Sequence, residues 1–125
     1  DRPVCLRVIA MQYLLLIQVP EANDDNRDVV EASGNDPAWA SYTNALIEAG
    51  VMRGGNELAA PATATIVRMR DGRRDVQDGP FIETKEQLGG YYMIETATLD
   101  EALEWAARCP AAAYGAIEVR ACMGG

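Results

Sequence analysis

Residues 78–95 read DGPFIETKEQLGGYYMIE, and the rest of the chain is organised around this stretch. It opens with an Asp-Gly-Pro turn at 78–80, since an aspartate side chain accepts backbone N–H bonds and glycine and proline favour turns. Phe81, the one phenylalanine of the chain, is expected to anchor the loop in the core. Five ionisable side chains then crowd into a short segment: Asp78, Glu83, Lys85, Glu86 and Glu95.

The second half of the stretch predicts a change from helix to strand. Thr84 and Gln87 have the spacing of a capping box, which predicts one helical turn. The glycine pair at 89–90 is expected to end that turn in the left-handed region. Residues 91–96 are aromatic and branched, a composition typical of a strand.

A β-hairpin is predicted immediately before this stretch. Strands at 63–70 and 73–78 flank Asp71-Gly72, a two-residue turn whose twist suits a hairpin. That register places Val67 opposite Val76 and Arg68 opposite Asp75.

Two helices are predicted elsewhere. The first has Asp36 as its cap, Pro37 in its first turn and Gly50 as its stop; its apolar positions recur at helical spacing: Trp39, Tyr42, Leu46 and Ala49. The second begins at a capping box formed by Thr98 and Glu101 and closes at Cys109-Pro110. Its expected apolar stripe is Leu99, Ala102, Leu103 and Ala106.

Three further strands complete the pattern. The apolar run at 11–19 predicts a strand in the middle of the sheet. Residues 51–58 predict a strand that bends or bulges at Gly54-Gly55, and 114–120 the last strand. Without the hairpin, the order is βαββαβ, the ferredoxin-like α+β arrangement with both helices on one sheet face. The uncovered face predicts a homodimer whose sheets face each other across a barrel-like interior.

Composition limits the classes of function. A length of 125 residues suits one domain, and a net charge of −8 disfavours direct binding to nucleic acid. Three cysteines without metal-type spacing indicate neither a disulfide framework nor a zinc site, and fit a cytoplasmic location. The apolar run at 4–17 is too short for a membrane helix and lacks a cleavage site. Residues 20–36 form an acidic connection.

Strand alternation predicts where chemistry could sit. Tyr91, Met93 and Glu95 share one side of their strand, and Glu118 and Arg120 share a side of the last strand. A carboxylate there could serve as an acid or base inside the dimer; alternatively, Arg120 forms an ion pair with the acids and closes the interface. We predict Asp78 and Glu95 as catalytic residues, and these as ligand-binding ones: Lys85, Tyr91, Glu83, Arg68 and Glu118.

Asp78 has two interpretations. As a turn former it is structural, whereas as a general base or ligand contact it would work with Lys85 as a charge partner. The chain contains no histidine, so imidazole-dependent nucleophile chemistry, zinc sites and histidine-ligated haem lack their usual group. Carboxylate, lysine, arginine or tyrosine chemistry remains, with or without Mg²⁺ or Ca²⁺. We assign no metal-ligating residues and predict no cofactor.

Several segments together resemble the DGPF subgroup of the YCII-related family of small bacterial proteins: DGPF, ETKEQLGGYY, LDEALEWAARCPAA, AIEVR, LLLI and ELAAPATATIVRMRDG. The resemblance implies a dimeric α+β barrel domain over 11–125, with residues 1–10 as an extension or expression remnant. Most members have no established reaction, and the histidine–aspartate pair suggested for better-studied relatives cannot exist here.

Two functions follow as hypotheses. In the first, the homodimer binds a small polar molecule between its sheets, with or without a cofactor-independent proton transfer or lyase-type step. In the second, the chain is a regulatory module that binds an extracytoplasmic-function sigma factor, as DGPF proteins often accompany these factors; the acidic 20–36 segment would suit a basic partner. Neither hypothesis involves nucleic acid or a membrane.

Overall fold

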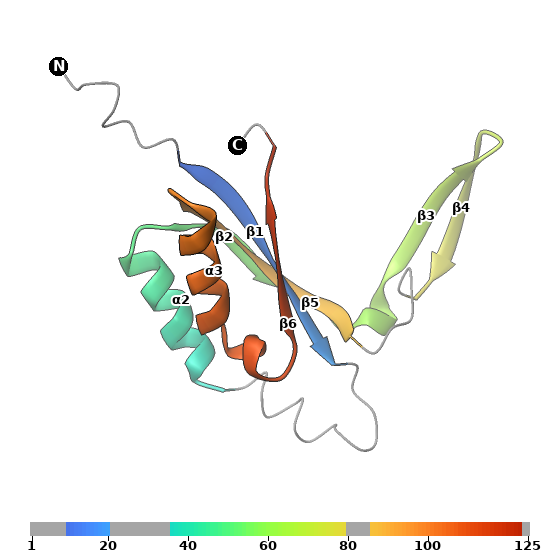
Figure 1. The fold of residues 1–125 in the computed structure, drawn as a ribbon. Coiled ribbons are helices and arrows are strands. Elements are labelled where there is room, and N and C mark those ends of the chain that lie inside the picture. Colours follow the sequence, from blue (N-terminus) through green and yellow to red (C-terminus); the bar gives the residue numbers. More distant parts are fainter. Residues whose placement is uncertain (1–9, 21–35, 80–85, 124–125) are drawn as a thin grey trace.

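The computed structural model describes residues 10–20, 36–79 and 86–123. The helices and strands in these ranges, labelled as in Figure 1, are β1 (Met11–Pro20), α2 (Ala38–Glu48), β2 (Met52–Glu57), β3 (Thr65–Arg70), β4 (Arg73–Asp78), β5 (Glu86–Thr96), α3 (Leu99–Arg108) and β6 (Ala116–Ala121). Short 3-10 turns at Pro61–Thr63 and Pro110–Ala113 precede β3 and β6.

The main sheet has four antiparallel strands in the order β2-β5-β1-β6. With the β3–β4 hairpin set aside, this is the strand order of a ferredoxin-like βαββαβ fold, as the element pattern predicts. The apolar strand β1 is interior, paired with β5 on one side and β6 on the other. Figure 1 shows α2 and α3 side by side on one face of this sheet.

The ends of α2 are fixed by its flanking residues. The Asp36 carboxylate accepts a hydrogen bond from the Ala38 backbone N–H at 2.9 Å, which confirms its capping role. At the other end Gly50 has a φ of 74°, and its N–H donates to the Ile47 carbonyl while Val51 donates to Leu46. This is a Schellman motif, which needs a residue that tolerates the left-handed region.

Helix α3 begins as predicted but buries a narrower stripe. The Thr98 hydroxyl accepts a hydrogen bond from the Glu101 backbone N–H at 3.2 Å. Ala102 and Ala106 are buried, whereas Leu99 and Leu103 are 49% and 45% exposed, so the predicted four-residue stripe is wrong at its leucines. The buried line continues instead to Cys109, which follows the helix.

The core lies between the sheet and the two helices. Leu15 of β1, Leu46 of α2 and Ile94 of β5 have no exposed surface, and around them pack the buried Tyr13, Ile17, Tyr42, Ala102, Ala106, Cys109 and Ala111. Alternate residues of β1 point into this core because side chains along a strand face opposite sides. The other residues of β1 therefore lie on the face away from the helices.

Strand β5 is longer than predicted. The expected helical turn is wrong at Glu86 and Gln87, which belong to β5; Gln87 pairs with Val19 and is 8% exposed. The glycines at 89–90 do not stop a helix. A Cβ on Gly90 would lie 2.9 Å from the Asn56 carbonyl oxygen, so this glycine permits close strand packing. Phe81 and Thr84 lie outside the described residues.

The hairpin has the predicted turn and register. Asp71 and Gly72 have φ values of 50° and 76°, as a type I′ turn requires. Val67 pairs with Val76 and Arg68 with Asp75. Within the described chain β3 and β4 pair only with each other, and Figure 1 shows the hairpin standing away from the main sheet on the side opposite the helices.

Candidate functional site

The sheet face away from the helices, called the open face below, carries three of the residues predicted as functional: Glu95, Tyr91 and Glu118. The strand register aligns its side chains in four rows that cross β6, β1 and β5: Cys122–Gln12–Glu95, Arg120–Leu14–Met93, Glu118–Leu16–Tyr91 and Ala116–Gln18–Leu88. In the described chain no helix covers this face (Figure 1). The orientation predicted for Tyr91, Met93 and Glu95 is therefore confirmed.

Glu95 is held by neighbours from two other strands. An Arg53 Nη2 atom of β2 lies 3.5 Å from one carboxylate oxygen of Glu95, and the Gln12 side-chain amide of β1 donates to the other at 3.5 Å. The Arg53 Nη1 also donates to the Gly50 and Met52 carbonyl oxygens, both at 2.9 Å. Backbone acceptors thus hold the guanidinium in place beside the Glu95 carboxylate.

A bulge in β2 brings Arg53 to this position. The pairing of β2 with β5 shifts between Met52 and Gly54, so that Arg53 is the extra residue. The Gly54-Gly55 pair predicts a bend or bulge here, and the register shift confirms it. At Gly55 a Cβ would lie 2.8 Å from the Tyr91 carbonyl oxygen, which explains the need for glycine.

The centre of the open face is apolar with a second polar group beside it. Leu14, Leu16 and Met93 are half-buried although neither α2 nor α3 packs on them. Next to them the Asn56 side-chain amide donates to the Tyr91 hydroxyl at 3.2 Å. An apolar centre with polar groups near its edge is the composition of a binding or association surface.

Glu118 forms an ion pair with Arg120, two residues along β6. This agrees with the structural interpretation of these charges, but Glu95 has no part in the pair. Strand β1 separates β6 from β5, and Glu118 lies in the row of Tyr91 rather than that of Glu95. The ion pair and the Arg53–Glu95 pair therefore lie at different corners of the open face.

The structure places the remaining predicted site residues apart from Glu95. Asp78 ends β4 opposite Thr65, at the base of the hairpin. That base lies beside the start of β5 (Figure 1), whereas Glu95 is one residue from the end of this strand. Nine residues of strand span roughly 30 Å. The structure thus does not bring Asp78 and Glu95 together, and Glu83 and Lys85 lie outside the described residues.

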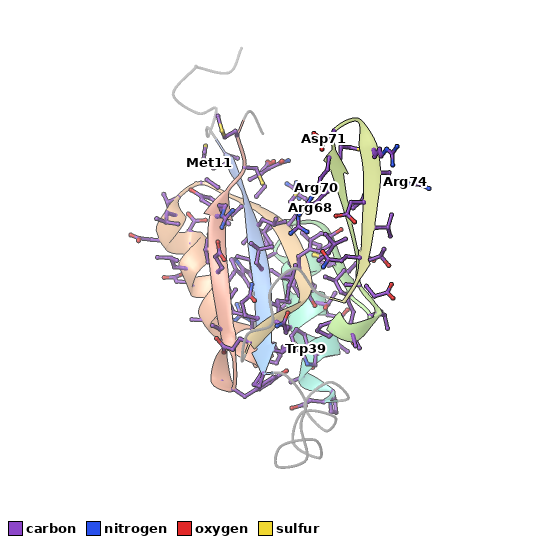
Figure 2. All side chains as sticks on the ribbon, turned by 90° about the vertical axis from the view of Figure 1, so that its right-hand side faces the viewer. Met11, Trp39, Arg68, Arg70, Asp71 and Arg74 are labelled. Carbon is purple, nitrogen blue, oxygen red and sulfur yellow. The ribbon has the colours of Figure 1, made fainter. Side chains whose placement is uncertain are left out.

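Arg68 projects from the hairpin. Its Nη1 donates to the Gln77 side-chain oxygen at 2.9 Å, and it is half-buried. Figure 2 shows Arg68 and Arg70 pointing to one side of the hairpin and Arg74 to the other. Arg68 therefore belongs to a different sheet from the Arg53–Glu95 pair.

A hydrogen-bonded aromatic cluster occupies the helix side of the sheet. The Tyr42 hydroxyl donates to the Trp105 carbonyl oxygen at 2.7 Å, and the hydroxyls of Thr43 and Tyr92 lie 2.7 Å apart. Burial raises the pKa of Tyr42, of Tyr92 and of the Cys109 thiol, so each stays protonated at neutral pH. These groups join α2, α3 and β5 and contribute to the core.

Metal and membrane features are not found in the described ranges. Among residues 10–20, 36–79 and 86–123, no three His, Cys, Asp or Glu side chains gather as metal ligands. No helix of the same ranges has the length and apolar character needed to cross a bilayer.

Comparison with known proteins gives the family. Residues 11–123 match the YCII-related domain. The chain belongs to the YCII-related family. This confirms the family resemblance of the sequence, while the DGPF subgroup stays a prediction.

A relative of this YCII-related protein occurs in Rhizobium meliloti (strain 1021), where it is described as uncharacterised. The two chains are 47% identical over 60 residues, and the alignment covers 48% of each. This chain thus spans about half the length of the curated relative that it matches. The relative supplies no activity.

The sequence did not indicate which side chains contact Glu95 and Tyr91 on the open face. Arg53, Gln12 and Asn56 were not among the predicted site residues, yet they hold Glu95 and Tyr91. Gln12 offers a signal, since it interrupts the apolar run of β1 on the side away from the core. Arg53 offers none, because its position depends on a bulge that alternation does not specify.

Proposed function

We propose that this YCII-related protein forms a homodimer through its open faces and binds a small polar ligand between the two sheets. The Arg53–Glu95 pair and Tyr91 are the contacts of that ligand. In this arrangement Glu95 accepts a hydrogen bond from a donor group and Tyr91, supported by Asn56, donates to an acceptor. In an enzymatic version Glu95 takes a proton from the bound compound without a cofactor.

One observation carries this proposal: a fixed guanidinium–carboxylate pair stands beside an apolar sheet face that no described helix covers. Half-buried leucines on such a face favour association with another surface, because association removes their remaining apolar area from water. An ordered charged pair contributes to binding mainly by selecting polar groups of the ligand, not by burying apolar area. The ligand is therefore expected to be small and polar.

The regulatory alternative has less support. It depends on the acidic residues between Pro20 and Asp36, and residues 21–35 lie outside the described residues. No described contact favours a sigma factor over a second copy of the chain.

Dimer formation is tested by a charge placed at the centre of the open face. Leu16→Glu is expected to raise the dimer dissociation constant by roughly a hundredfold or more, because an unpaired charge buried at an interface costs several kcal/mol. The measurement is sedimentation velocity over a dilution series. Leu103→Glu on α3, where the leucine is 45% exposed, is the matched control and is expected to behave as wild type. Equal dissociation constants for Leu16→Glu and wild type would contradict open-face pairing.

Ligand binding is tested by a thermal-shift screen of polar metabolites. Compounds that stabilise the wild-type protein are expected to lose that effect with Glu95→Gln, while the dimer and its unliganded melting temperature stay close to those of wild type. Glu101→Gln, an exposed change in the first turn of α3, is the control that keeps the response. A shift that persists in Glu95→Gln places the ligand elsewhere.

A further inference from the structure

The β3–β4 hairpin exposes apolar side chains that nothing in the described chain covers. Val67, Met69 and Val76 are 56%, 66% and 51% exposed, and all three lie on one side of the two-stranded ribbon. An isolated two-stranded hairpin is marginally stable in water, because half of its side chains have nothing to pack against. This side of the hairpin therefore favours association with a further surface.

The pattern of residues on that side is orderly. Directly opposed residues of an antiparallel pair share a face, so the register gives three rows: Thr65 with Asp78, Val67 with Val76, and Met69 with Arg74. We call these six residues the ribbon face. It has an acid at the base of the hairpin, a valine pair in the middle and a cation towards the turn. Figure 2 shows that Arg74 points away from Arg68 and Arg70, which occupy the other side.

Such a pattern is complementary to itself. Consider two ribbons stacked face to face and related by a two-fold axis. The axis lies midway between the two faces, runs across the strands and passes over the valine row. This symmetry reverses the order of the three rows in the second copy. Each Arg74 then lies over the second copy's Asp78, and each valine row lies over its counterpart. The contact thus forms two symmetric Arg74–Asp78 ion pairs between the copies and buries the valine rows. A self-complementary patch of this kind is what an isologous interface requires.

Charge also favours a second copy over other partners. The hairpin, residues 65–78, contains four arginines and three aspartates, so its net charge is +1. The whole chain has a net charge of −8, so the remainder has −9. A partner with a uniform charge of either sign would meet a like charge at Asp78 or at Arg74, whereas an identical ribbon in the reversed orientation meets neither.

We propose that the ribbon face is a second self-association surface, through which hairpins of two copies stack face to face with Arg74 on the second copy's Asp78. It is distinct from the open face and does not depend on ligand binding there. Asp78 then acts in assembly rather than in proton transfer.

The size of the surface sets its strength. Six side chains from each copy make a smaller contact than the 20–30 residues a side of a stable interface. Stacking of hairpins is therefore weak on its own and concentration-dependent, and it links copies that are already paired through a larger surface. Salt is expected to weaken it, since both ion pairs lie near solvent.

Charge reversal and charge exchange test the proposal. Arg74→Asp and Asp78→Arg each oppose like charges at both symmetric positions, so each is expected to raise the dissociation constant of the hairpin contact by roughly tenfold or more. The double exchange Arg74→Asp with Asp78→Arg restores opposite charges across the two-fold axis and is expected to return the constant to within roughly threefold of wild type. Within one hairpin the two residues are four positions apart on β4, so the rescue cannot arise inside one chain.

The constants are measured by sedimentation equilibrium from low to high protein concentration, with circular dichroism to compare folding. The same variants are also measured in the Leu16→Glu background, where open-face pairing is weakened. The hairpin contact and the open-face contact can then be accepted or rejected separately. Arg73→Asp, an exposed change on the other side of the hairpin and opposite Arg70, is the control and is expected to leave the constant unchanged. The proposal is overturned if the single reversals associate as wild type, if the exchange associates no better than either single change, or if the Leu16→Glu protein stays monomeric at every concentration.

Discussion

Single glycines decide how closely the strands of this protein approach their neighbours. A Cβ built on Gly115, which precedes β6, would overlap the Gln18 carbonyl oxygen and lie 3.3 Å from the Ala111 carbonyl oxygen. Both obstacles are backbone atoms, which cannot move aside as a side-chain end can. Gly54 in the β2 bulge is the opposite case, since a Cβ there would meet no atom within 4 Å.

Gly115→Ala is expected to lower the free energy of unfolding by about 1–3 kcal/mol, because the added methyl group must push backbone apart. Gly54→Ala is the matched control, and an alanine in open space changes stability by less than about 1 kcal/mol. Urea denaturation of both variants measures the difference. A Gly115→Ala protein as stable as Gly54→Ala would show that the close approach is relaxed at no cost.

At the scale of elements, the hairpin differs from the main sheet in its support. Strands β1 and β5 pair along their full length and bury alternate residues against two helices. Strands β3 and β4 bond to each other, and the Gly79 backbone N–H closes their base by donating to the Ala64 carbonyl oxygen at 2.8 Å. Local stability follows buried contacts, so the two sheets should open separately.

Hydrogen exchange at low protein concentration is expected to reveal this difference. Amides of β3 and β4 should exchange well before those that join β1 to β5, because opening the hairpin exposes little apolar area. Peptide-resolved mass spectrometry measures both sets in one experiment. Equal protection in the two sheets would mean that the hairpin opens only when the whole fold does.

The elements also indicate how far sequence alone reaches. Turn chemistry at Asp71-Gly72 and the caps at Asp36, Gly50 and Thr98 act locally, so they were predictable and are confirmed. Gly89-Gly90 misled because glycine suits both a helix stop and a tight strand approach, and the choice depends on Asn56, distant in sequence. The exposure of Leu99 and Leu103 depends on how α3 is rotated against the sheet, which a stripe of apolar residues does not fix.

The candidate site was predictable to the same extent. Alternation places Tyr91 and Glu95 on the open face, because it depends on strand geometry alone. The separation of Asp78 from Glu95 was not predictable, since the direction in which a hairpin leaves its sheet is set by the connections around it. Arg53 reaches Glu95 through a bulge, and no residue of the bulge specifies which side chain it redirects.

At the scale of the whole molecule, buried phenol and thiol groups link stability to pH. Burial raises the pKa of Tyr42, of Tyr92 and of Cys109 above their ordinary values of 10.0, 10.0 and 9.0. A group with a raised pKa keeps its proton longer in the folded state than in the unfolded state. Its contribution to stability is complete below the unfolded pKa and is lost as the pH rises beyond it.

The free energy of unfolding is therefore expected to fall above about pH 9, with a slope of up to ~1.4 kcal/mol per pH unit for each group. Tyr42→Phe should flatten the slope above about pH 10, although it lowers stability at neutral pH by removing the hydrogen bond to Trp105. Urea titrations at several pH values measure both effects. An unchanged slope in Tyr42→Phe would show that this phenol does not control the alkaline response.

The two arginine–glutamate pairs at the corners of the open face have a consequence for the acidic chain as a whole. Arg53 neutralises Glu95 and Arg120 neutralises Glu118, so these four charges of the open face cancel within each copy. The surplus of eight negative charges accumulates elsewhere on the molecule. In the proposed homodimer the two open faces would therefore meet without net charge repulsion, while the negative charge of the remaining surface would oppose unspecific association with other molecules.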